Sequence, residues 1–168
     1  MNPTGIDYLL QLAGLSLSFV GFSAVAVTVR RALGGELSEG HIRLVRLYIE
    51  TGLAVTALSL VPMLLSLLGV AEATLWRLAS LAAASLLTVL MIVQFRRRRR
   101  IEGRFPAWVV AVYVTSAAAV LALWLNAVGV PYGPGAAPYA VSLTWSLLVS
   151  GYIFLQSLDL FLRPSAKE

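Results

Sequence analysis

The sequence predicts an all-α fold, a polytopic bundle of transmembrane helices that crosses the bilayer five times. Three observations lead to this prediction: 59% of the 168 residues are hydrophobic, only 12% are charged, and the apolar residues occur in long uncharged stretches. Soluble domains are about half apolar and about a quarter charged. The polar residues here are too few to cover a globule, so apolar surface must face lipid. The whole chain, residues 1–168, is expected to form a single transmembrane domain.

The first three predicted spans alternate with short polar segments. Residues 8–29 are uncharged and supply the roughly 20 residues that a spanning helix requires. The second span is predicted at 44–70 and contains Pro62, which membrane helices tolerate because neighbouring groups can bind the carbonyl that proline leaves without a donor. The third span is predicted at 75–95. The turn before it is short, so spans two and three should form an antiparallel hairpin.

The last two spans come from one uncharged stretch, between Phe105 and Leu158, that is too long for a single helix. Segment 129–138, with the sequence GVPYGPGAAP, is dense in glycine and proline, which is typical of a turn. The stretch therefore divides into predicted spans at 106–128 and 139–162.

The basic residues predict the orientation. Cytoplasmic loops of membrane proteins contain an excess of Lys and Arg. The segments after spans one, three and five are rich in Arg and Lys, whereas Arg77 is the single basic residue expected on the opposite side. We therefore expect the amino terminus outside and the carboxyl terminus in the cytoplasm of a cell membrane of the bacterial inner-membrane type.

Aromatic residues agree with this orientation, because Trp and Tyr favour both membrane–water interfaces. Several fall at the predicted outer boundary, and a second set falls at the inner one. The outer set is Tyr8, Trp76, Trp124, Tyr132 and Tyr139, and the inner set is Tyr48, Phe105 and Trp108.

A run of arginines follows the third span directly. A dense row of cations attracts any polyanion, including nucleic acid, but beside a membrane span it is better explained as an anchor on anionic lipid headgroups. We predict such contacts, and no nucleic-acid partner, for Arg96, Arg97, Arg98, Arg99, Arg100 and Arg104.

Two acidic residues near the predicted cytoplasmic ends of spans two and five could belong to one polar cluster. If these spans are neighbours, the cluster contains Glu50, Asp159, Gln156, Arg46 and Arg163. One interpretation is a set of ion pairs that fixes the helix ends. The other is a mouth that attracts cations, because an acid within a membrane helix is a functional candidate.

Small residues recur on one face of two spans, at Gly14, Ser18 and Gly21 and at Ser142, Ser146 and Ser150. Small residues allow close approach between membrane helices. These faces are predicted to be packing seams, with a serine-lined aqueous path as the alternative.

The sequence lacks the residue patterns of common catalytic sites. It has no cysteine and a single histidine, His41, so thiolate chemistry, histidine-based triads and metal clusters are disfavoured. We expect no enzymatic activity, no cofactor and no metal site.

Two functions are compatible with these features. The first is a homo-oligomeric cation channel or channel-like transporter, because self-association through the small-residue faces would supply a path that five spans cannot enclose alone. The second is a non-catalytic accessory or scaffold membrane subunit that binds a partner protein or anionic lipid through its arginine-rich cytoplasmic face.

Overall fold

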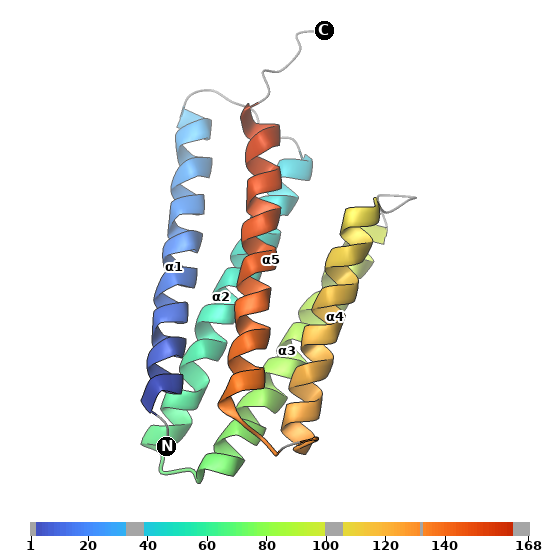
Figure 1. The fold of residues 1–168 in the computed structure, drawn as a ribbon. Coiled ribbons are helices and arrows are strands. Elements are labelled where there is room, and N and C mark those ends of the chain that lie inside the picture. Colours follow the sequence, from blue (N-terminus) through green and yellow to red (C-terminus); the bar gives the residue numbers. More distant parts are fainter. Residues whose placement is uncertain (1–2, 33–38, 100–105, 132, 163–168) are drawn as a thin grey trace, which may run out of the picture.

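The computed structural model describes residues 3–32, 39–99, 106–131 and 133–162, and these residues form five long α-helices (Figure 1). Within these ranges, the side chains of residues 3–4, 26, 30–31, 39–41, 43–44 and 156–162 lie outside the described part. Each helix is long and apolar enough to cross a membrane. The predicted all-helical class is therefore confirmed for the described residues. The helices are α1 (Pro3–Ala32), α2 (Glu39–Leu67), α3 (Glu72–Arg99), α4 (Ala107–Val128) and α5 (Ala136–Leu162).

Glycines in the left-handed region end two of the helices. Gly69 has a φ of 71° and Gly129 a φ of 86°, a conformation that glycine adopts without the steric cost of a Cβ atom. After each glycine the next amide turns back onto the helix: Val70 N donates to Leu65 O at 3.2 Å, and Val130 N donates to Leu125 O at 3.0 Å. Both chain reversals lie where the sequence predicts turns.

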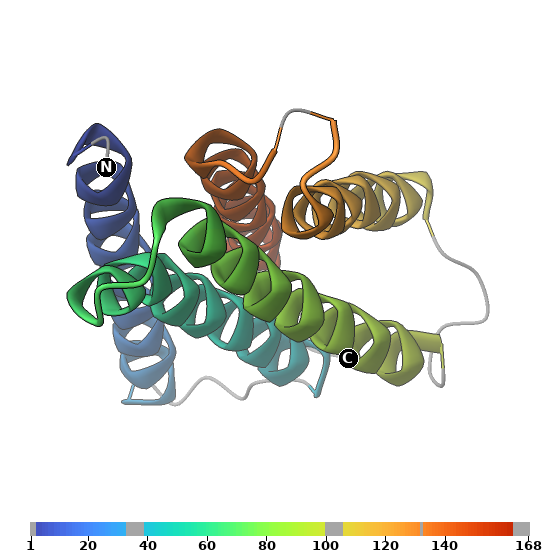
Figure 2. The ribbon, with the colours of Figure 1, turned by 90° about the horizontal axis from the view of Figure 1, so that it is seen from below.

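The helices form a bundle in which α5 contacts each of the other four. Figure 1 shows α1 beginning and α5 ending at opposite ends of the bundle. Seen from below, in Figure 2, α1 and α4 lie on opposite sides, with α2 and α5 between them. Spans two and five are therefore neighbours, which is the arrangement that the predicted polar cluster requires.

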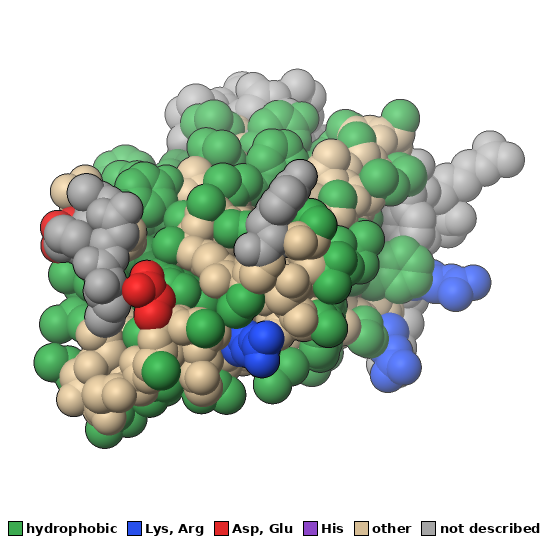
Figure 3. Space-filling view, turned by 60° about the horizontal axis from the view of Figure 1, so that its bottom comes forward, with side chains coloured by type: hydrophobic (Ala, Val, Ile, Leu, Met, Phe, Trp, Pro, Cys, Tyr) green, Lys and Arg blue, Asp and Glu red, His purple; other side chains and the backbone are tan. Residues whose placement is uncertain are grey.

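The core contains residues from all five helices, and the outer surface is also largely apolar. Leu9 of α1, Val55 of α2, Leu75 of α3, Leu123 of α4 and Leu143 of α5 are all buried. Large apolar side chains are nevertheless exposed on every helix, and hydrophobic side chains predominate on the face drawn in Figure 3. An exposed apolar surface of this extent is expected of a protein whose solvent is lipid.

Three of the aromatic side chains predicted to be interfacial anchors pack inside the bundle. Trp76, Tyr139 and Tyr48 are buried, so their assignment as interfacial anchors was wrong. The ring centroids of Trp76 and Tyr139 are 5.9 Å apart, and the ring of Tyr48 packs edge-on against Phe154 at 5.3 Å. Aromatic pairs at these separations are favourable, so the ring contacts stabilise the buried positions.

Helices α1 and α2 are in close contact at Gly52. Ser16 donates its hydroxyl to the carbonyl of Gly52 at 2.8 Å, and a Cβ atom added at Gly52 would lie 2.5 Å from Cγ2 of Val20. The absence of a side chain at residue 52 therefore allows the two backbones to approach each other, as small residues do between membrane helices.

Asn126 joins three segments near the α4–α5 connection. Its Nδ2 donates to Oγ of Ser80 in α3 at 2.8 Å and to the carbonyl of Gly135 at 2.9 Å, and its Oδ1 accepts from the Gly135 amide at 2.9 Å. A buried amide with three such bonds is well satisfied. It fixes the start of α5 against α3 and α4.

Candidate functional site

One end of the bundle brings together the carboxyl ends of α1, α3 and α5 and the amino ends of α2 and α4 (Figure 1). The described charged side chains there are five arginines and one glutamate: Arg46, Arg96, Arg97, Arg98, Arg99 and Glu50. We call this group the arginine-rich end. Other residues predicted for the same region lie outside the described part, either entirely or in their side chains, namely Arg100, Arg104, Gln156, Asp159 and Arg163.

Glu50 is bound by arginines from two helices. Arg46, one turn earlier in α2, places its Nε 2.6 Å from Oε1 of Glu50, and Arg97 of α3 places its Nη1 3.2 Å from Oε2. The Glu50 side chain is 25% exposed, against 64% for Arg46 and 44% for Arg97. Two guanidinium groups therefore surround one half-buried carboxylate, and their combined charge exceeds its own.

The contact between α2 and α3 continues one turn deeper. Gln94 Nε2 lies 3.4 Å from Oγ1 of Thr51, and Thr51 donates its hydroxyl to the carbonyl of Leu47 at 2.9 Å. Glu50 therefore pairs with Arg97, and the next residue of α2, Thr51, contacts Gln94, one turn before Arg97 in α3. This arrangement fixes which arginine of the run faces α2.

The remaining described arginines of the run point in different directions around α3. The guanidinium carbon of Arg98 lies 5.5 Å from the centre of the Trp108 ring at the start of α4, a cation–π geometry. Arg96 and Arg99 are exposed and line a groove between α3 and α4. Among the described residues, neither is paired with a carboxylate.

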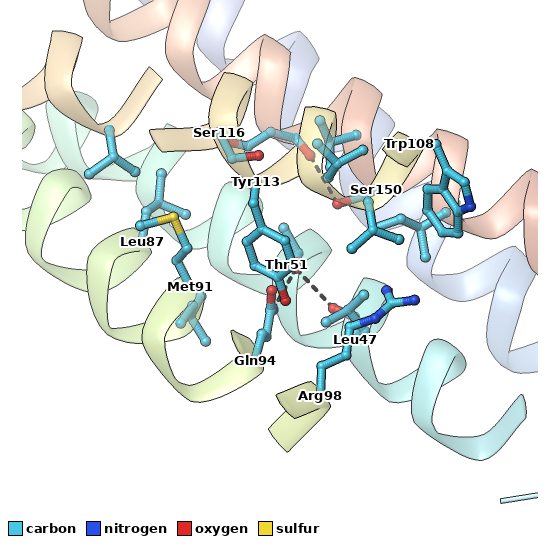
Figure 4. Close-up of a pocket in the computed structure, with 17 residues that line it drawn as sticks. Leu47, Thr51, Leu87, Met91, Gln94, Arg98, Trp108, Tyr113, Ser116 and Ser150 are labelled. Carbon is cyan, nitrogen blue, oxygen red and sulfur yellow. Dashed lines mark hydrogen bonds between the residues drawn. The ribbon is translucent and has the colours of Figure 1, made fainter. Parts of the chain in front are cut away.

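A small cavity lies between α2, α3, α4 and α5, close to the arginine-rich end (Figure 4). Its volume is about 90 Å³, and because a buried water needs only about 10–15 Å³, it has room for several. Apolar side chains form most of its wall, and its polar lining residues are Thr51, Gln94, Arg98, Tyr113, Ser116, Ser146 and Ser150.

The serine face of α5 is divided between a helix contact and this cavity. Ser142 is buried and donates to the carbonyl of Ala119 in α4 at 3.2 Å. Ser146 and Ser150 line the cavity, but each donates its hydroxyl to the carbonyl four residues earlier, at 2.9 Å. Because these donors are already used, the two serines present mainly acceptor lone pairs to the cavity.

The small residues singled out in α1 lie on the outer surface of the bundle. Gly14, Ser18 and Gly21 are exposed, and a Cβ atom added at either glycine would have no neighbour within 4 Å. The α1 seam that packs against α2 contains Ser16 and Val20 instead. The sequence contained one signal for this seam, Gly52, which lies within the predicted second span.

No protein-family model, no curated protein and no solved structure matches the chain. In the part of the chain that the structure describes, no group of three or more His, Asp or Glu side chains could hold a metal ion. The function must therefore be inferred from the geometry of the arginine-rich end.

Proposed function

We propose that this multi-pass membrane protein is a non-catalytic accessory or scaffold subunit that binds anionic lipid headgroups through its arginine-rich end. The principal support is the outward placement of Arg96 and Arg99, which are exposed and, among the described residues, unpaired with any carboxylate. A partner protein that binds this end would do so at a surface already in contact with anionic lipid.

The proposed orientation places this end in the cytoplasm. Anionic lipid gives the cytoplasmic leaflet a negative surface potential, and each Lys or Arg near that surface contributes about 1 kcal/mol of attraction. Among the described side chains at the opposite end of the bundle, Arg77 is the single basic one. Headgroup binding and the positive-inside rule therefore favour the same orientation, with the amino terminus outside.

The homo-oligomeric cation channel receives less support from the same geometry. Its cation-attracting mouth would consist of Glu50 and Asp159. The Asp159 side chain lies outside the described part, and the Glu50 carboxylate is bound by both Arg46 and Arg97. An excess of guanidinium groups at the pore mouth would repel cations and attract anions. Ser146 and Ser150 do line a cavity, but its volume of about 90 Å³ lies within one protomer.

Tryptophan quenching by brominated lipids tests lipid binding in the reconstituted protein. Trp108, which is 39% exposed, lies beside Arg98 and is retained as the single tryptophan, with Trp76, Trp124 and Trp145 changed to Phe. We expect brominated phosphatidylglycerol to quench Trp108 more strongly than brominated phosphatidylcholine. The difference should shrink at high salt, because salt screens exposed charges, and in the variant with Arg96, Arg98 and Arg99 changed to Gln.

A second single-tryptophan variant gives the matched control. Trp124 is 38% exposed and lies near the end of α4 remote from the arginines, so both lipids should quench it equally. Circular dichroism of each variant shows whether the helices are retained. Equal quenching of Trp108 by the two lipids, with the helices intact, would refute the proposal.

A further inference from the structure

A groove runs along the lipid-facing side of the bundle between α3 and α4. Its volume is about 470 Å³, within the range of about 300–1,000 Å³ that small-molecule sites occupy. Helix α3 contributes one set of side chains and α4 the other. The lining residues are Met91, Ile92, Phe95, Arg96 and Arg99 from α3 and Tyr113, Val114 and Ala117 from α4.

The chemistry of the groove changes along its length. The last turn of α3 places Arg96 and Arg99 at one end, and residues three apart on a helix share a face. Deeper in the bundle the wall is aliphatic, with Ile92, Val114 and Ala117. The groove therefore has two cationic side chains at the arginine-rich end of the bundle and an apolar wall farther from that end.

The dimensions fit one acyl chain in one leaflet. The nine residues from Met91 to Arg99 span eight steps, or about 12 Å, along α3, compared with about 15 Å for half of the hydrocarbon core of a bilayer. Ala117 lies ten residues, or about 15 Å, beyond the start of α4. A chain in this groove would reach most of the way to the middle of the bilayer with its headgroup beside the arginines.

We propose that the α3–α4 groove is a discrete binding site for one anionic phospholipid, with the phosphate between Arg96 and Arg99 and an acyl chain over Ile92, Val114 and Ala117. This inference rests on the proposed function and deepens it, because it replaces a general attraction to charged lipid with a site of defined residues. Charge complementarity selects the headgroup, and the apolar wall selects a lipid over a free phosphate.

Native mass spectrometry of the detergent-solubilised protein can count bound lipids and rank the variants. Dioleoyl phosphatidylglycerol should bind with a stoichiometry of one and outcompete dioleoyl phosphatidylcholine, and glycerol 3-phosphate should not displace it. Changing Arg96 and Arg99 to Gln should weaken binding by about fivefold for each arginine. Arg98→Gln removes the same charge outside the groove, beside Trp108, and should leave this stoichiometric binding almost unchanged.

Two variants in which an alanine is changed to tryptophan distinguish binding in the groove from attraction to the overall positive charge of the arginine-rich end. Ala117→Trp fills the groove and should abolish the bound lipid, whereas Ala118→Trp, at an exposed neighbour that does not line the groove, should not. Both sites are exposed, so circular dichroism should show the helices retained.

The outcomes distinguish the two proposals. If the arginine variants lower the preference for anionic lipid but Ala117→Trp does not, headgroup binding stands and the discrete site is refuted. If glycerol 3-phosphate displaces the lipid, the site recognises phosphate alone and the acyl-chain contact is wrong. If Ala117→Trp instead abolishes a dimer peak, a second copy of the chain occupies the groove and the lipid site is refuted.

Discussion

The hydroxyl of Tyr139 in α5 donates to the carbonyl of Leu58 in α2 at 2.6 Å. Leu58 lies four residues before Pro62, so its carbonyl is the one that the missing proline N–H leaves without a helical partner. Tyr139 supplies that donor from a neighbouring helix. A buried tyrosine and a proline in different spans therefore form one structural unit.

We expect Tyr139→Phe to lower the free energy of unfolding by about 1 kcal/mol, because the Leu58 carbonyl loses its partner within an apolar interior. Pro62→Ala restores an amide that can bond this carbonyl within α2. The same Tyr139→Phe change should therefore cost less in the Pro62→Ala background. Unfolding in mixed detergent and dodecyl sulfate micelles, followed by circular dichroism, measures the four variants. Equal costs in both backgrounds would show that the two residues act independently.

Gly52→Ala should destabilise the α1–α2 contact by about 1–3 kcal/mol, the usual cost of overpacking. The new methyl group would lie 2.5 Å from Cγ2 of Val20, and a β-branched side chain in a helix cannot rotate away easily. The midpoint of the same unfolding titration reports the loss. Gly14→Ala is the matched control, since a Cβ atom there has no neighbour within 4 Å; similar shifts in the two variants would contradict the assigned seam.

Glu50→Gln distinguishes headgroup binding from cation conduction. Removing the carboxylate releases Arg46 and Arg97 from their ion pairs, so anionic lipid at Trp108 should become enriched by up to about fivefold. Glu72→Gln makes the same charge change at the other end of α3 and should leave the quenching of Trp108 unchanged. A cation conductance of reconstituted wild-type protein that loses selectivity in Glu50→Gln would instead favour the channel.

The orientation can be tested with single cysteines, because the chain contains none of its own. Ala73→Cys lies at the start of α3 and Ala32→Cys at the end of α1, both at exposed residues and at opposite ends of the bundle. In intact bacterial cells, a membrane-impermeant maleimide should label Ala73→Cys, and should label Ala32→Cys only after lysis, since basic residues near α1 keep that end inside. The reverse labelling pattern would place the arginine-rich end outside.

Much of the local structure follows from the sequence. The uncharged stretches and the glycine- and proline-rich turns predict five helices, because spanning length and turn chemistry are local properties of the chain. The predicted chain reversals coincide with the left-handed Gly69 and Gly129. The choice between a packing seam and a cavity for Ser142, Ser146 and Ser150 was not predictable, because it depends on which helix packs against each turn of α5.

By itself, the sequence determined the apolar helices, the turns between them and the concentration of arginine beside the third and fourth spans. Only the tertiary structure decided which groups meet: Arg97 with Glu50, Tyr139 with Leu58, Ser16 with Gly52, and Arg96 and Arg99 beside an apolar groove. The physical reason is that lipid-facing and core-facing side chains of a membrane helix are equally apolar. Hydrophobic periodicity then does not show which face of a helix points inward, and helix rotation is set by packing and hydrogen bonds between helices.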